Sequence, residues 1–202
     1  MESSSATGEA AAGGPSPLAA LWPGLSRRQL VELAVPGATI GLMGGLIAGF
    51  MAAVGGLSPG LVVIATVALA VPLALTGGGF DLLLAKGRIP LGPLTPVAIY
   101  WFLAFPLARV FHAVVLNLLA GDPVVVPHGW LDFVVYQMLL SVGFAIGFWW
   151  LHQSFAPRWW FHLRLRNPVA RYFIDDQLKY VGVLYDQQRQ RRDERRARRR
   201  AG

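Results

Sequence analysis

Long apolar runs alternate with short polar segments along the chain, and their lengths predict four membrane-spanning helices. About 20 predominantly apolar residues are needed for a helix to cross the hydrocarbon core of a bilayer. The predicted spans are residues 33–54, 61–76, 96–120 and 131–155, of which the second falls a little short of this length. The expected fold class is therefore an all-α integral membrane protein with four transmembrane helices.

The segments outside the spans differ in composition and divide the rest of the chain. Residues 1–26 are predicted to be a disordered N-terminal tail, because they are mostly small and polar. The transmembrane domain then covers residues 27–156. Residues 157–188 are expected to form an interfacial segment followed by an amphipathic surface helix, and residues 189–202 a basic tail.

The connection between the second and third spans, residues 77–95, opens with three consecutive glycines. These glycines lack the Gly-Lys-Ser/Thr ending of a phosphate-binding loop. The apolar part of the segment is too short to cross a bilayer. We expect it either to lie in the membrane interface or to form a short re-entrant turn.

The distribution of basic residues predicts the orientation. Seventeen of the 18 Lys and Arg residues lie outside the four spans, and the eighteenth is Arg109. The loops at 55–60 and 121–130 contain none, whereas the other connection and both flanks of the spans do. Because Lys and Arg are enriched on the cytoplasmic side, both termini are predicted to be cytoplasmic, in a bacterial inner membrane.

Overall composition excludes several classes of function. Charged residues make up 14% of the chain, against roughly 25% in soluble domains. There is no cysteine, which excludes disulfides and thiolate ligation. The net charge of +7 could indicate nucleic acid, but no pattern of stacking aromatic residues accompanies the C-terminal arginines. The charge therefore favours anionic lipids as the partner.

The first span carries glycines at every fourth position: Gly37, Gly41, Gly45 and Gly49. On a helix these positions form one flat stripe, and small residues at this spacing let two helix backbones approach closely in a membrane. The stripe predicts close packing, either with another span of the same chain or with another subunit.

Arg109 lies about halfway along the third span, where a cation costs roughly 2.5–3.5 kcal/mol on insertion scales. His112 shares its helix face and Asn117 lies on the rim of the same sector. At similar depth the fourth span offers Gln137 and Ser141, both neutral. Three interpretations follow: Arg109 snorkels to the cytoplasm, pairs with an acid from another component, or lines a path for an anion or proton.

No catalytic or metal-binding constellation is found in the sequence. His112 and His152 differ by roughly 15 Å in depth, so one chain cannot hold a haem between them. His112 is interpreted either as a structural hydrogen-bonding residue or as a contact to a cofactor or quinone. Any cofactor-binding role is assigned only to Arg109, His112 and Asn117, and no intrinsic cofactor is expected. Contact with a cofactor or lipid held by a partner subunit stays open.

Two C-terminal features point to surfaces beyond the bundle. A mixture of aromatic and basic residues predicts binding to anionic lipid headgroups: Arg158, Trp159, Trp160, Arg164 and Arg166. Asn167 and Pro168 then resemble a helix start. The helix that follows has an apolar stripe that needs a bilayer surface or a partner protein: Ile174, Leu178, Val181 and Tyr185.

Together these features favour a non-catalytic accessory subunit of a larger membrane complex, with an energy-converting assembly, respiratory or photosynthetic, as the expected host. Such a protein would not be an enzyme itself, although it would belong to a complex that is. The alternative is a small homo-oligomeric transporter or channel with the third span lining the path. A membrane enzyme acting on lipids or quinones is a third interpretation.

Overall fold

A computed structural model describes residues 17–120 and 129–201, and each element in them is a helix. In chain order these are α1 (Pro17–Leu21), the short 3-10 helix η1 (Trp22–Gly24), α2 (Arg27–Val54), α3 (Pro59–Ala85), α4 (Leu94–Ala120), α5 (Trp130–Leu163) and α6 (Pro168–Ala201). Helices α2 to α5 are long and apolar enough to cross a membrane. The predicted all-α, multi-pass architecture is confirmed to this extent.

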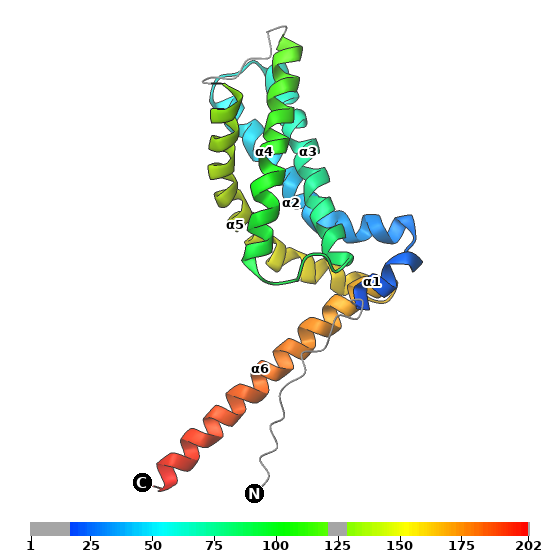
Figure 1. The fold of residues 1–202 in the computed structure, drawn as a ribbon, viewed down its shortest axis with the longest axis vertical. Helices are drawn as coiled ribbons and strands as arrows, with labels where there is room; N and C mark the ends of the chain where they lie inside the picture. The colour runs from blue at the N-terminus through cyan, green and yellow to red at the C-terminus, as the bar shows by residue number, and fades with distance from the viewer. Residues whose placement is uncertain (1–16, 121–128, 202) are drawn as a thin grey trace, which may run out of the picture.

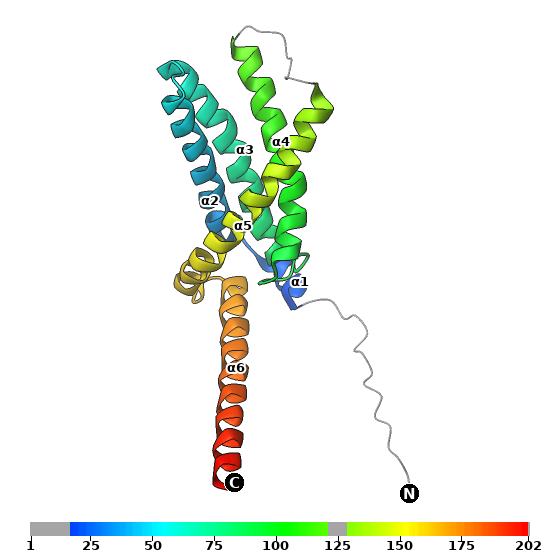
Figure 2. The ribbon, with the colours of Figure 1, turned by 90° about the vertical axis from the view of Figure 1, so that its left-hand side faces the viewer.

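Helices α2 to α5 form two hairpins, α2–α3 and α4–α5, that pack side by side (Figure 1). Helices α1 and α6 both attach at the same end of this four-helix body. We call it the basic end, because the exposed residues Arg27, Arg28, Lys86 and Arg88 lie there. At the opposite, far end the tips of the two hairpins lie apart (Figure 2).

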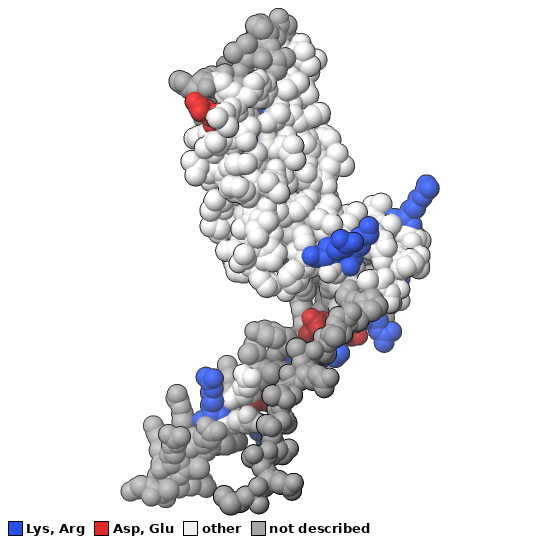
Figure 3. All heavy atoms as spheres, viewed as in Figure 1, with Lys and Arg blue, Asp and Glu red and all other residues white. Residues whose placement is uncertain are grey.

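Apolar side chains cover the outside of the four-helix body, as expected for helices in contact with lipid. Figure 3 shows an almost entirely white upper part, with blue spheres gathered at its lower edge and below. Large exposed apolar residues occur on each of the four helices, among them Phe50, Leu75, Leu107 and Leu139, each 67–71% exposed. Such a surface would be an aggregation hazard in water and is ordinary in a bilayer.

Helix α2 begins with a capping box, in which Ser26 and Gln29 exchange side-chain and backbone hydrogen bonds. Pro36 lies inside the helix, and the first part of α2 runs across the basic end before the helix turns into the body (Figure 1). Proline lacks an N–H, so the carbonyl of Glu32 loses its helical donor. The indole Nε1 of Trp159 donates to that oxygen instead, at 2.8 Å.

Helix α3 is longer than predicted from the sequence. The predicted span ended at residue 76 and residues 77–95 were expected to be a loop, but the helix continues through the three glycines to Ala85. Gly77 lies so close to Gly37 of α2 that a Cβ on either one would overlap the backbone of the other. The glycines therefore permit helix contact, and this packing outweighs their poor helix propensity.

Both ends of the chain form helices where they are described. Residues 17–26 were expected to belong to a disordered tail, yet Leu18 of α1 is buried and the ring of Trp22 lies under the Lys86 ammonium at 4.7 Å. Residues 1–16 lie outside the described residues. Helix α6 runs on through the predicted basic tail to Ala201.

The C-terminal half of α5 runs across the basic end and continues as helix to Leu163, into the segment predicted to be interfacial. Asn167 then caps α6, as its oxygen accepts from the backbone N–H groups of Val169 and Ala170. The first turns of α6 are buried against the body through Val169, Ala170, Phe173 and Ile174. The rest of the helix extends away from the bundle (Figure 2).

Candidate functional site

Within the part of the chain that the structure describes, the hydrogen-bond partners of Arg109 are both neutral. Its Nε donates to Oε1 of Gln137 on α5 at 3.2 Å, and its Nη1 lies 3.3 Å from Nδ1 of His112, one turn along α4. Gln137 is 2% exposed, so the contact lies inside the helix pair rather than on its surface. We call Arg109, His112 and Gln137 the arginine cluster.

Asn117, the third candidate from the sequence, does not join this cluster. Its side-chain amide donates to the carbonyl of Ala113 at 2.8 Å, which is one turn back on the same helix. Ser141, at a similar depth on α5, likewise bonds to its own helix, through the carbonyl of Met138 at 2.6 Å. The side chains of Asn117 and Ser141 therefore form hydrogen bonds within their own helices. Gln137 and His112 are the described partners of the guanidinium.

The arginine cluster leaves a positive charge and several N–H groups without a matching anion among the described residues. A guanidinium has five N–H donors, and the two contacts involve Nε and Nη1 only. Acids in the described ion pairs are engaged elsewhere, Glu32 with Arg28 and Arg166, Asp81 with His152, and Asp175 with Arg171. The cluster can therefore bind one carboxylate or another anion.

A second polar cluster, which the sequence analysis missed, joins three helices near the basic end. Asp81 of α3 is 1% exposed, and its Oδ1 lies 2.6 Å from Nε2 of His152 on α5. Its other oxygen accepts from the backbone N–H of Gly37, in the bent part of α2, at 2.7 Å. We call Asp81, His152 and Gly37 the aspartate cluster, and it fixes α2, α3 and α5 to one another.

Aromatic rings surround the aspartate cluster and separate it from solvent. Phe148 stacks on His152 with ring centroids 5.6 Å apart, while Phe80 and Trp160 meet the imidazole edge-on at 5.5 and 5.7 Å. Asp81 falls in the segment 77–95 that the sequence predicted to be interfacial or re-entrant, because the second span was predicted to end at residue 76 whereas α3 continues to Ala85. The available signal was an acid within an otherwise apolar run from Phe80 to Leu84, and an ionisable residue in such a place needs a partner.

A layer of aromatic side chains lies between the two clusters. Along α5, Phe144 and Phe148 come between Gln137 and His152, and the two clusters are about 22 Å apart along the helix. Trp101 of α4 is fully buried and contacts both phenylalanine rings, at 4.6 and 4.7 Å between centroids. The polar groups are thus arranged as two separate sites rather than as one continuous path.

The glycine stripe of α2 packs against α3 of the same chain. The backbone or side chains that face it, from the basic end to the far end, belong to Gly77, Leu73, Ala70 and Thr66. A Cβ at Gly37, Gly41, Gly45 or Gly49 would overlap these atoms. All four glycines are buried, so the stripe is occupied inside the chain and is not a free surface for another subunit.

Of the residues predicted to bind lipid headgroups, some pack inside the protein and others lie on its surface. Trp160 is 1% exposed and packs on Phe173 of α6 at 4.5 Å, and Trp159 bonds to Glu32 as described above. Arg166 lies 3.4 Å from the same Glu32 side chain. Arg164 covers the ring of Phe161 at 3.5 Å. Arg158 is exposed and takes part in none of the described ion pairs.

The apolar stripe of α6 is only partly covered. Ile174 is buried against the body, whereas Leu178 and Val181 are 63% and 54% exposed. The side chain of Tyr185 lies outside the described residues. Leu178 and Val181 also line a shallow pocket of about 410 Å³ together with Arg158 and Phe161 of α5. One face of α6 therefore lacks an apolar partner in this part of the chain.

Comparison with known proteins adds no further assignment. The chain matches no protein-family model, and no curated protein and no solved structure is detectably similar to it. The function must therefore be argued from the two polar clusters, the glycine packing and the geometry of α6.

Proposed function

We propose that this protein is a non-catalytic subunit of a larger membrane assembly, and that an energy-converting complex is the host. The observation that carries the proposal is Arg109, a cation halfway along a membrane-spanning helix whose described partners, Gln137 and His112, are both neutral. A cation at that depth is costly and normally has a counter-charge. We infer that another chain supplies it.

The depth of Arg109 favours a protein carboxylate over a lipid phosphate. Arg109 lies about 22 Å from the start of α4 and about 16 Å from its end, at 1.5 Å per residue. The hydrocarbon core is about 30 Å thick, so phosphates lie more than about 15 Å from its centre. An acidic side chain on a partner helix reaches this level without thinning the bilayer. Gln137 and His112 then hold the guanidinium in position for it.

The far end of the body offers an apolar surface to such a partner. The tips of the two hairpins lie apart there (Figure 2). An apolar groove of about 440 Å³ runs between α3 and α4 in this half, lined by Val63, Val67, Phe111 and Val115 among others. Phe111 lies two residues on from Arg109, which places it about 200° around α4 from the guanidinium. The groove is therefore an apolar contact surface for a partner helix, on a different face of α4 from the arginine cluster.

Helix α6 supports the same proposal from the other end. With 34 residues it is about 51 Å long, and the buried residues among its described side chains lie in its first turns. By the enrichment of basic residues at the end where it attaches, that end is cytoplasmic, and so are both termini. A long basic helix with exposed Leu178 and Val181 is suited to bind a peripheral part of the assembly or an anionic lipid surface.

The alternative is a small homo-oligomeric transporter with α4 lining the path, and the aromatic layer argues against a path through the interior of one chain. Trp101, Phe144 and Phe148 fill the interior between the arginine and aspartate clusters. A transported ion or solute would have to displace these packed rings. The interpretation as a non-catalytic subunit rests on the two polar clusters, because neither of them combines a nucleophile, a general base and an open cavity.

Purification of the native protein in a mild detergent tests this proposal. A subunit should co-purify with larger membrane chains in a fixed ratio, and should accumulate poorly when their genes are deleted. Quantitative mass spectrometry of the purified sample gives the ratio. Isolation as a stable, monodisperse homo-oligomer that moves a solute across liposome membranes would contradict the proposal and favour the transporter.

A further inference from the structure

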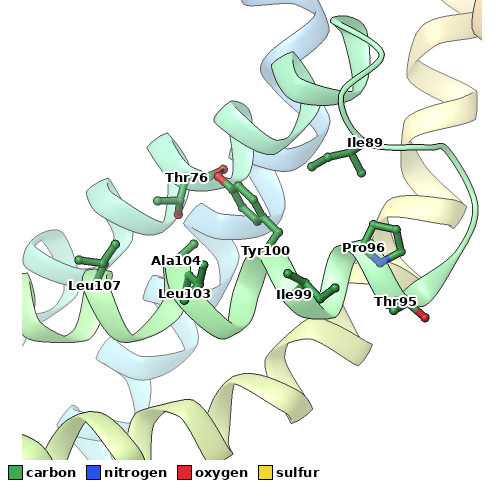
Figure 4. A pocket seen from close by; sticks show the side chains of 9 residues that line it. All are labelled: Thr76, Ile89, Thr95, Pro96, Ile99, Tyr100, Leu103, Ala104 and Leu107. Atoms are coloured by element: carbon green, nitrogen blue, oxygen red, sulfur yellow. Dashed lines mark hydrogen bonds between the residues drawn. The ribbon is translucent and has the colours of Figure 1, made fainter. Parts of the chain in front are cut away.

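An apolar groove lies on the outside of the bundle between the C-terminal part of α3 and the first half of α4. Its volume is about 590 Å³, and its lining is Thr76, Ile89, Thr95, Pro96, Ile99, Tyr100, Leu103, Ala104 and Leu107 (Figure 4). Ile99, Leu103 and Leu107 are 57–69% exposed, so the groove opens sideways to the surface that faces lipid.

The middle of the groove offers no free hydroxyl proton to a ligand. Three of the lining residues carry hydroxyl groups: Thr95 lies at the end next to the loop, whereas Thr76 and Tyr100 lie next to one another in the middle (Figure 4). Tyr100 Oη donates to the backbone carbonyl of Thr76 at 2.6 Å, and Thr76 Oγ1 donates to the carbonyl of Pro72 at 2.8 Å. Since the hydroxyl protons of Tyr100 and Thr76 are already used, the part of an occupant that lies beyond Thr95 in the groove has to be hydrocarbon.

The length and position of the groove match one leaflet of a bilayer. From Thr95 to Leu107 it follows α4 for twelve residues, which is about 18 Å. Half of a hydrocarbon core is about 15 Å. The groove begins at the basic end and stops near the middle of α4, so it covers the depth of a single acyl chain.

The loop at the end of the groove where a headgroup would lie carries a cation. Ile89 belongs to the loop that closes this end, and Arg88, the residue before it, is exposed and takes part in none of the described ion pairs. Lys86 is close by in sequence but covers the Trp22 ring. Arg88 is therefore the basic residue at this edge that is free to meet an anion.

We propose that this groove is a binding site for one anionic phospholipid, with an acyl chain along Ile99, Leu103 and Leu107 and the phosphate at Arg88. The lipid fills a surface hollow between α3 and α4 that no described side chain fills. The site is independent of the proposed subunit function, because it needs no partner protein.

The test uses the full-length protein in lipid nanodiscs that contain a trace of phospholipid with a photoreactive acyl chain. The probe has either a phosphatidylglycerol or a phosphatidylcholine headgroup, and labelled peptides are quantified by mass spectrometry. We expect the phosphatidylglycerol probe to label residues 95–107 about fivefold more strongly, the ratio that about 1 kcal/mol per basic residue at a headgroup gives.

Two pairs of matched variants separate the site from general lipid contact. Leu103→Trp fills the groove and should lower labelling of 95–107 severalfold, whereas Leu75→Trp, at a 71% exposed position outside the groove, should not. Arg88→Gln should remove the headgroup preference, and Arg27→Gln should keep it. Equal labelling by both probes in the parent protein, or labelling unchanged in Leu103→Trp, would overturn the proposal. Cross-linking of a diazirine analogue of leucine at position 103, which keeps the size of the native side chain, to a protein instead of to lipid would also overturn it.

Discussion

Replacing Gly41 by alanine should push α2 and α3 apart, and the structure gives the size of the displacement. A Cβ at Gly41 would overlap the carbonyl of Leu73 and lie 2.8 Å from the backbone nitrogen of Ala74. Ordinary van der Waals contact begins at 3.4 Å, so the helices must part by at least 3.4 − 2.8 = 0.6 Å at that nitrogen, and by more at the carbonyl. The contacting atoms are rigid backbone that cannot rotate away.

Overpacking of this kind costs about 1–3 kcal/mol. The gain in helix propensity from Gly to Ala, about 0.5–1 kcal/mol, offsets only part of it. We therefore expect Gly41→Ala to lower the free energy of unfolding by about 1–2 kcal/mol. Reversible unfolding of the detergent-solubilised protein by sodium dodecyl sulfate, followed by tryptophan fluorescence, measures this change.

Gly143→Ala on α5 is the matched control. A Cβ there meets nothing within 4 Å, and the position is exposed. The same chemical change should therefore be neutral or stabilise by up to about 1 kcal/mol. If Gly41→Ala is as stable as Gly143→Ala, the close approach of α2 and α3 along the glycine stripe is wrong.

Three further predictions concern the aspartate cluster, α6 and the topology. Asp81→Leu leaves the His152 ring and the Gly37 N–H unpaired, and should lower the free energy of unfolding by about 1–3 kcal/mol. The double variant Asp81→Leu/His152→Leu should lose less than the sum of the two single variants. Additive losses in the same unfolding assay would show that the two residues do not interact. Deletion of residues 189–202 should weaken binding to anionic vesicles in a salt-dependent way but leave assembly intact. Deletion of residues 168–188 removes the buried Val169, Phe173 and Ile174, and should impair assembly. Equal co-purification of partners with both deletion variants would argue against α6 as a docking element. Because the chain has no cysteine, single-cysteine variants report topology cleanly: Ser58→Cys should react with an impermeant maleimide added outside intact cells and Gln187→Cys should not, and the reverse pattern would invert the orientation.

The number of long helices could be predicted from hydropathy, but the end of α3 could not. Residues 77–79 are glycines, which favour loops in a helix-propensity argument. They are helical here because Gly77 packs against Gly37, a contact between residues 40 positions apart in the chain. Information of that kind is absent from local sequence. The same error hid the aspartate cluster, since Asp81 reaches His152 only when α3 continues past the glycines.

The arginine cluster could be predicted in part. Depth along antiparallel spans placed Gln137 near Arg109, and helix periodicity placed His112 on its face. Asn117 lies on the rim of that face and bonds to its own helix, which periodicity cannot distinguish from a shared site. The glycine stripe predicted close packing, but the choice between an internal helix and another subunit depended on the fold.

The central claim is that a partner chain supplies a carboxylate to Arg109, and co-purification with Arg109 variants tests it most directly. Arg109→Leu should insert into the membrane at least as well as the parent, because a costly charge is removed. It should nevertheless lose the larger membrane chains, since an unpaired buried acid costs about 3–5 kcal/mol. Arg109→Lys should retain a fraction of them, because lysine keeps the charge without the planar fork. Partner chains that co-purify with Arg109→Leu in the same ratio as with the parent protein would contradict the claim.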